Sequence, residues 1–269
     1  MVQDAARSAL ALHGRPARLA VVSAADPVDR TSGRLVHLPD APFLVGELSP
    51  ADVLQPLVDG PVLVDNDVNW AARAERQART DEAMADFAYL YLGEGLGAAI
   101  VSDGQVRRGN HGLAGEIAHL VVTGPAGQAI RFTDVFADLG LRRTGSTAID
   151  VPALLTTTSR GPRAEASRTA LATAICDVLA ALVALSDPAR VIIGGTWGSD
   201  PDILTAIKAR SRELPRTTAI ETASVQHEPS LTGARTEALE QLRRTITTSA
   251  RTLAKGTGEP TNTLAQGQE

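Results

Sequence analysis

The stretch VDNDVNWAARAER, residues 64–76, marks a junction between a strand and a helix. The apolar run at 61–65 ends on three polar residues, Asp65, Asn66 and Asp67, and helix-forming residues follow. Side chains at the carboxyl end of a buried strand point into the crevice where α/β proteins bind ligands. A carboxylate there can accept a hydroxyl proton, and an amide can donate to and accept from hydroxyls. The structural alternative is that Asp65 or Asp67 caps the helix.

Outward from this junction, apolar runs and helical patterns alternate along the chain. One segment differs, FAYLYLGEGLGAAIVSDGQVRRG at 87–109, where glycines and the Asp103-Gly104 pair predict a β-hairpin. The pattern therefore predicts a mixed α/β protein with ligands at strand ends. We expect strands at 17–24, 61–65, 120–123, 189–198 and 217–224, and helices at 3–12, 50–58, 68–80, 112–119, 165–186, 200–213 and 230–250.

Composition excludes several classes of function. The net charge is -5 and aromatic residues make up 3%, so neither a phosphate track nor a base-stacking platform is expected. The single cysteine, Cys176, lies in an apolar helical run and is expected to be buried and unreactive. No secretion signal or membrane-length apolar stretch is expected, and one cysteine suits a reducing compartment. We therefore expect a cytoplasmic protein with no membrane partner.

Three motifs together carry a family resemblance. The stretch at 64–76, the segment GEGLGAAIVSDGQVRRGNHGLAGEIAH at 93–119 and VIIGGTWG at 191–198 occur in this order. They resemble the ROK family of bacterial sugar kinases and sugar-responsive repressors, over most of residues 20–245. The resemblance implies an actin-like (ribonuclease H-like) fold of two lobes, with sugar and ATP in the cleft.

The resemblance also implies a division of the chain. Residues 1–85 are expected to form the first lobe and residues 86–229 the second, with the helix at 230–250 packing back on the first lobe. Residues 251–269 are expected to be disordered. The family's D-x-G-G-T hairpin does not occur in this sequence. We therefore expect an incomplete first lobe in a truncated chain, whose open sheet edge favours cover by a partner or a homodimer.

The sugar site follows from the same resemblance. Asp67 matches the catalytic base and Asn66 a sugar ligand. Glu116 and His119, three residues apart and thus on one face of a helical turn, match residues that contact sugar hydroxyls. Asp134 is placed at a further sugar-binding position. The family's histidine also holds zinc with three cysteines, which do not follow His119 here, so we expect no metal.

The phosphate site departs from the family. Glu94 stands where the family has threonine in its glycine-rich turn, and a carboxylate near a triphosphate is repulsive by roughly 1–4 kcal/mol. ATP binding is therefore expected to suffer. The glycines expected to approach the nucleotide are Gly93, Gly95 and Gly97 in this turn and Gly194 and Gly195 toward the end of the segment 189–198.

The expected function is sugar sensing. We expect the effector lobe of a ROK-type transcriptional regulator, which binds a small sugar or sugar phosphate without efficient catalysis and without a cofactor, with Asp67 a vestigial or dormant base. About ten helical residues before the first strand cannot form a helix-turn-helix, so this chain alone is not expected to bind specific DNA. One alternative is an ATP- and Mg²⁺-dependent sugar kinase that uses Asp67 as base. Another is a scaffold that binds nothing.

Overall fold

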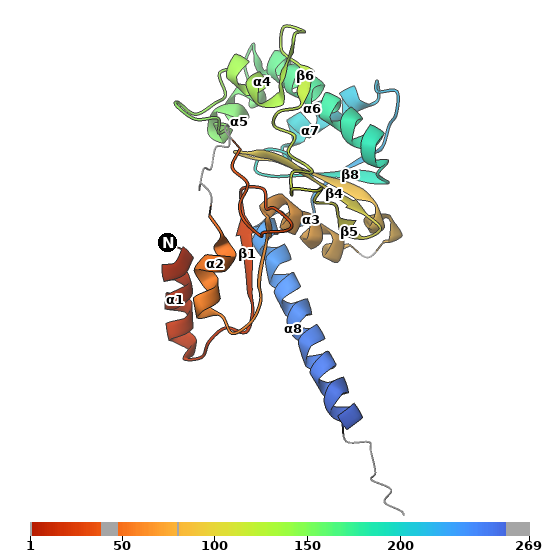
Figure 1. The fold of residues 1–269 in the computed structure, drawn as a ribbon. Coiled ribbons are helices and arrows are strands. Elements are labelled where there is room, and N and C mark those ends of the chain that lie inside the picture. Colours follow the sequence, from red (N-terminus) through yellow and green to blue (C-terminus); the bar gives the residue numbers. More distant parts are fainter. Residues whose placement is uncertain (1, 39–47, 80, 257–269) are drawn as a thin grey trace, which may run out of the picture.

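The first sheet contains the strand that opens the 64–76 stretch. The structure, a computed structural model, describes residues 2–38, 48–79 and 81–256 (Figure 1). Within these residues β1 (Ala20–Ala24) and β2 (Val62–Asn66) form a parallel two-stranded sheet, in register from Ala20 opposite Val62 to Ala24 opposite Asn66. Both predicted strands are confirmed. Three short elements precede β2 in sequence: α1 (Val2–His13), α2 (Pro50–Leu54) and the 3₁₀ turn η1 (Gln55–Leu57).

The second sheet has five strands in the order β5-β4-β3-β8-β9. β3 pairs antiparallel with β4 and parallel with β8, which confirms the hairpin. The Asp103-Gly104 turn joins β4 to β5 and has φ angles of 52° and 69°, the geometry that an Asp-Gly pair favours in two-residue hairpin turns. The strands are β3 (Phe87–Leu92), β4 (Leu96–Ser102), β5 (Gln105–Val106), β8 (Arg190–Gly194) and β9 (Ala219–Thr222).

Helix α3 (Asp67–Ala78) lies between the two sheets. Val68 and Ala72 on α3 pack with Phe87 and Tyr89 of β3 in one buried cluster. On its other side, the Trp70 indole Nε1 donates to the Val22 carbonyl of β1 at 2.9 Å. α3 is thus shared by both sheets, so its first turn lies where the two sheets meet.

Helix α8 (Pro229–Gly256) packs against α3 and β1 and then projects from the body (Figure 1). It continues beyond residue 250, where the sequence analysis begins a disordered tail. The reason is local composition, because 251–255 contains neither glycine nor proline. The rest of the expected tail, 257–269, lies outside the described residues.

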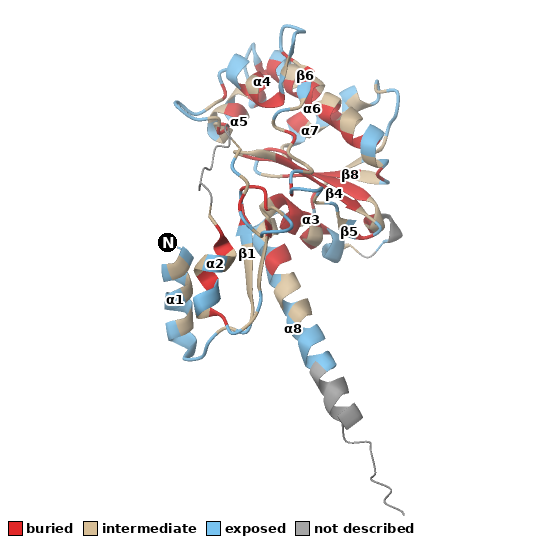
Figure 2. Cartoon of the chain, viewed as in Figure 1, coloured by how far each residue is buried: buried red, intermediate tan, exposed pale blue. Residues whose placement is uncertain are grey.

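The other face of the five-stranded sheet carries the largest buried core (Figure 2). It is covered by α4 (Phe132–Asp138), α5 (Val151–Ser159), α6 (Ala164–Ser186) and α7 (Pro201–Ser211). By length and composition alone α6 could cross a membrane, a test that the core helix of a soluble protein also passes. Its Leu171, Ile175 and Leu179 lie fully in the core. Cys176 on α6 is also buried, and burial raises the pKa of its thiol to about 11.

The segment 112–119 is not the predicted helix but a series of turns. Gly112 and Gly115 have φ angles of 79° and 97°, which a right-handed helix does not allow. Gly115 also lies directly on β4: its carbonyl accepts from the Ala98 amide at 2.8 Å, and a Cβ on Gly115 would be 1.9 Å from the Ala98 oxygen. The antiparallel strands β6 (Val121–Thr123) and β7 (Ala129–Arg131) follow this segment in the chain.

Candidate active site

A cavity of about 360 Å³ lies where β1 and β2 end and meet the second sheet. A cavity of this size is at the lower end of the range for small-molecule sites. It is bounded by the ends of β1 and β2, the glycine-rich turn before β4, and the turns at 112–119. Six residues that the sequence predicted for sugar or nucleotide line it: Asn66, Asp67, Gly95, Gly97, Glu116 and His119.

Asn66 and Asp67 both cap α3 and line the cavity. The Asn66 Oδ1 and the Asp67 Oδ1 accept from the Val68 amide at 2.9 and 2.8 Å. The Asn66 amide nitrogen faces the carbonyls of Ala24 and Ala25 at 3.5 and 3.4 Å, at the end of β1. The helix-cap interpretation and the ligand-binding interpretation of this junction therefore both apply. Asn66 and Asp67 cap α3, and the same two residues line the cavity.

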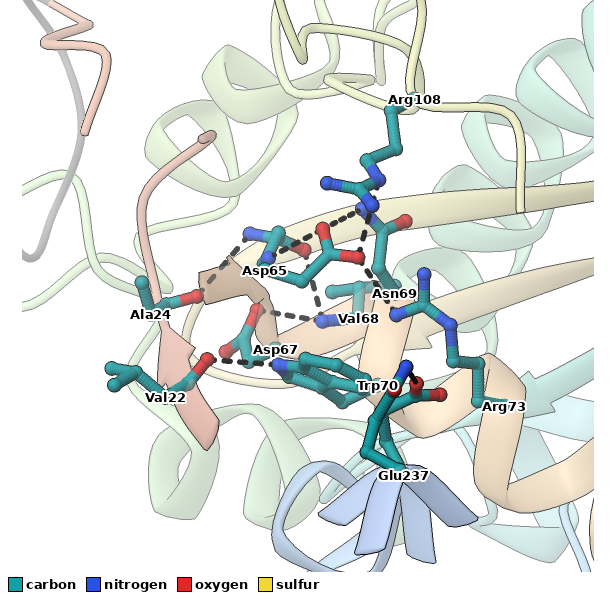
Figure 3. Close-up of polar contacts among 12 residues, drawn as sticks. Val22, Ala24, Asp65, Asp67, Val68, Asn69, Trp70, Arg73, Arg108 and Glu237 are labelled. Carbon is teal, nitrogen blue, oxygen red and sulfur yellow. Dashed lines mark hydrogen bonds and ion pairs between the residues drawn. The ribbon is translucent and has the colours of Figure 1, made fainter. Parts of the chain in front are cut away.

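Asp65 lies outside the cavity. Its side chain is almost fully buried, and its carboxylate accepts from Asn69 Nδ2 at 2.8 Å and pairs with Arg73 at 2.7 Å (Figure 3). Of the two aspartates in the opening stretch, only Asp67 thus lines the cavity. The change from strand to helix gives this division, since Asp65 lies in β2 whereas Asp67 is the first residue of α3.

Two of the carboxyl groups that line the cavity, those of Asp67 and Glu116, have raised pKa values. Burial raises the pKa of Asp67 to about 6, although the Val68 amide lowers it, and the nearby charge of Asp26 raises it further. Burial also raises the pKa of Glu116, and the charges of Asp67 and Asp26 add to this effect, which brings the pKa to about 7. A carboxylate that titrates near neutral pH suits a general base, because it is ionised yet holds a proton well.

The glycine-rich turn reaches Asp67 because Gly97 has no side chain. A Cβ on Gly97 would be 2.9 Å from Cγ2 of Val68 in the first turn of α3. Glu94 in this turn is ion-paired with Arg143, which follows α4. Sequence reasoning missed Arg143, and its charge offsets the repulsion expected between Glu94 and a phosphate. Gly93 is not among the described lining residues; its carbonyl accepts from Trp197 Nε1 at 2.8 Å.

The second pair of predicted glycines packs against β3. A Cβ on Gly194 would be 2.2 Å from the Tyr89 hydroxyl, and one on Gly195 would be 2.3 Å from the Leu92 oxygen. Neither is among the described residues that line the cavity, whereas the next residue, Thr196, is. These two glycines therefore let the strand end approach β3 closely.

Asp134 lies in the first turn of α4 and is held by two arginines. Its carboxylate pairs with Arg131 at 2.7 Å and Arg142 at 2.9 Å, and hydrogen bonding from Arg131, followed by that from Arg142, lowers its pKa. It is not among the described lining residues, which include its neighbour Thr133. Its carboxylate is thus engaged by two arginines, and the sugar-binding role expected for Asp134 stays a prediction. His119 lines the cavity from an exposed position, and that it holds no zinc stays a prediction.

Comparison with known proteins decides the family. Residues 4–140, just over half of the chain, match the ROK family. The chain belongs to the ROK family. A beta-glucoside kinase of Listeria innocua is 31% identical over 186 residues, which cover 65% of this chain and 63% of that protein. An N-acetylmannosamine kinase of Salmonella heidelberg is 28% identical over 192 residues, covering 67% of this chain and 66% of that protein.

A solved structure confirms the fold class. A ROK family glucokinase from Streptomyces griseus, in complex with glucose and AMPPNP, aligns with a TM-score of 0.65 and 26% identity. The alignment covers 86% of this chain and 85% of that one. This ROK chain therefore has the actin-like, mixed α/β fold of its family, and the first-lobe sheet has two strands within the described residues.

The comparisons contradict the expected function. The relatives that match about two thirds of the chain are named kinases, and a structural relative was solved with a sugar and a nucleotide analogue. The expectation of a regulator lobe that senses sugar without efficient catalysis is therefore wrong. It gave too much weight to Glu94, whose charge Arg143 neutralises.

Proposed function

We propose that this chain transfers a phosphoryl group from ATP to a hydroxyl of a small sugar. The observation that carries the proposal is the position of Asp67: a carboxylate with a pKa of about 6 at the mouth of β2, in one cavity with the glycine-rich turn. Sugar kinases among the relatives support the same chemistry. The matched kinases are longer than the aligned region, so the activity of this chain is a proposal in its own right.

Each lining group has a role in this reaction. Asn66, Glu116 and His119 bind sugar hydroxyls, and Asp67 takes the proton of the attacking hydroxyl. The hydroxyl oxygen forms a bond to the γ-phosphorus while the bond to the bridging oxygen breaks, and ADP leaves with that electron pair. The proton is held on Asp67 until solvent removes it.

The nucleotide would lie on the glycine-rich turn. The backbone amide of Gly95 and the Thr196 hydroxyl are suited to phosphate oxygens, since both residues line the cavity and carry hydrogen-bond donors. The Arg143 guanidinium beside Glu94 adds positive charge at this end. A bound Mg²⁺ would neutralise charge on the phosphates as they separate.

The test is ADP release by the purified chain with glucose, N-acetylmannosamine and a β-glucoside in turn. We expect turnover with at least one sugar, lost by about 10²–10⁴-fold in Asp67→Asn. The matched control is Asp52→Asn, whose side chain is 77% exposed on α2 and should change nothing. Turnover that persists in Asp67→Asn, or no ADP release with any of these sugars, would contradict the proposal.

A further inference from the structure

We propose that Asp65 is a positioning residue, which fastens the segment carrying Glu116 and His119 to the strand end carrying Asp67. The link is its ion pair with Arg108, at 3.4 Å, across the junction of the two sheets. Its effect on turnover rests on the proposed function, whereas its effect on the segment itself does not.

The Asp65 carboxylate is the centre of a small buried network. Oδ1 accepts from the Asn66 amide at 2.9 Å and from Asn69 Nδ2 at 2.8 Å, while Oδ2 faces Arg73 at 2.7 Å and Arg108 at 3.4 Å. Its side chain is only 2% exposed. A carboxylate at such a position is stable only when it is paired and hydrogen-bonded, and here each oxygen has two donors.

These contacts divide into two groups. Asn66, Asn69 and Arg73 belong to β2 and α3, and hold the strand-helix junction together from within. Arg108 comes from the second sheet, just after β5, and extends toward Asp65 (Figure 3). Arg108 therefore joins the buried Asp65 carboxylate of the junction directly to the segment 107–120.

The segment 107–120 also meets the loop after β1, through exposed side chains and one backbone contact. Arg30 donates to the Gly109 carbonyl at 3.1 Å, and His111 faces Asp29 at 3.7 Å. Gly112 lies against the Val28 carbonyl, where a Cβ would be 2.0 Å away. On the second sheet, the Gly115 carbonyl accepts from the Ala98 amide at 2.8 Å, next to Glu116. Arg108 also turns the segment, since its carbonyl accepts from the Ala114 amide at 3.2 Å. Loss of the Asp65 contact would thus loosen the turns that carry Glu116 and His119.

Two adjacent arginines allow a matched comparison. Arg108, 35% exposed, faces Asp65, whereas Arg107, 50% exposed, pairs with the exposed Asp103 at 2.6 Å within the hairpin. Arg108→Gln and Arg107→Gln remove the same charge from neighbouring positions of one segment. Only Arg108→Gln should weaken sugar binding, by about threefold to tenfold, the scale of a partly buried ion pair.

The first readout is amide hydrogen exchange without sugar. We expect faster exchange at residues 113–120 in Arg108→Gln and in Asp65→Asn, and unchanged exchange in Arg107→Gln. Equal exchange in Arg108→Gln and Arg107→Gln would overturn the proposal. This readout needs no turnover, so it remains decisive even if the chain phosphorylates no sugar.

The second readout is a double-mutant cycle on the sugar dissociation constant, measured by calorimetry with the sugar that the ADP-release screen selects. Asp65→Asn and Arg108→Gln should each weaken binding, and the double variant should be weaker by less than the product of the two. KM for the sugar should rise while kcat stays within about threefold, because Asp67 is untouched. Strictly multiplicative losses would show that Asp65 acts only through α3, and would overturn the link.

Discussion

Asp65 and Asp67, two residues apart, lie in opposite electrostatic surroundings. Asp65 is paired with Arg73 at 2.7 Å and with Arg108 at 3.4 Å, whereas Asp67 has no ion-pair partner among the described residues. Asp67 instead accepts from the Val68 amide at 2.8 Å and lines the cavity, with a pKa raised to about 6. The junction therefore separates two tasks: one carboxylate is neutralised and positions, and the other stays available for a proton.

The pH dependence of turnover should follow Asp67. The base must be ionised to accept a proton, so kcat/KM should rise with pH and level off above about 6, rather than near the ordinary aspartate value. The Asp26 charge adds to the effect of burial in raising the pKa of Asp67, so Asp26→Asn should move this rise of kcat/KM to lower pH. The measurement is a pH-rate profile of both proteins. If kcat/KM rises over the same pH range in Asp26→Asn as in the parent, a group other than Asp67 controls the pH dependence.

The free energy of unfolding should fall as Asp67 becomes ionised. Its folded pKa is raised from 3.8 to about 6, so the stability that this group contributes is present below pH 3.8 and lost as pH rises through 6. Asp67→Asn should therefore be more stable than the parent at pH 7.5, by about 1–3 kcal/mol, with little difference at pH 4. Urea unfolding at both pH values tests this. An equal change in the free energy of unfolding at both pH values would show that the new amide group, and not the loss of an ionised carboxylate, causes the effect.

The Glu94–Arg143 pair should set the affinity for ATP. Arg143→Gln leaves the Glu94 charge uncompensated beside the glycine-rich turn, so KM for ATP should rise about threefold to tenfold. Glu94→Gln in the same background should reverse this rise, because it removes the repulsive charge. Kinetics at varied ATP and saturating sugar provide the comparison. If the double variant keeps the high KM, Arg143 acts on ATP directly rather than through Glu94.

The approach of Gly115 to β4 should be intolerant of a side chain. Gly115→Ala places a Cβ 1.9 Å from the Ala98 oxygen at a φ of 97°, so it should cost at least about 2 kcal/mol and weaken sugar binding. The control is Gly127→Ala, which shares a positive φ, 83°, but has no atom within 4 Å. It should cost about 1 kcal/mol and leave binding unchanged. Similar losses of stability and sugar binding in the two variants would show that the backbone conformation, and not the contact with Ala98, causes the effect.

Local signals were enough to predict much of the fold and part of the cavity. The β2–α3 junction combines a buried strand with capping residues, and the β4–β5 hairpin has an Asp-Gly turn, so short stretches determine both. Asn66, Asp67, Glu116 and His119 were placed together through the family resemblance. The helix expected at 112–119 is the exception, because the contact between Gly115 and Ala98 outweighs a helical pattern.

Contacts between distant residues could not be predicted in this way. Glu94 and Arg143 are 49 residues apart, and neither has a local pattern that indicates its partner. The same holds for Asp65 and Arg108. For Asp134 there was a local signal, because Arg131, three residues before it, could have indicated the ion pair at the start of α4. No helix was predicted at α4 or α5, because these helices have only seven and nine residues and a short run gives a weak helical pattern.

The most direct test of the central claim is the fate of the γ-phosphoryl group. The purified chain is incubated with ATP, Mg²⁺ and each of the three sugars, and the sugar is analysed by mass spectrometry and ³¹P NMR. We predict a sugar monophosphate that forms with the parent protein and with Asp52→Asn, and that is lost with Asp67→Asn. ADP without a phosphorylated sugar, or equal product with Asp67→Asn, would contradict the assignment of Asp67 as the base of a sugar kinase.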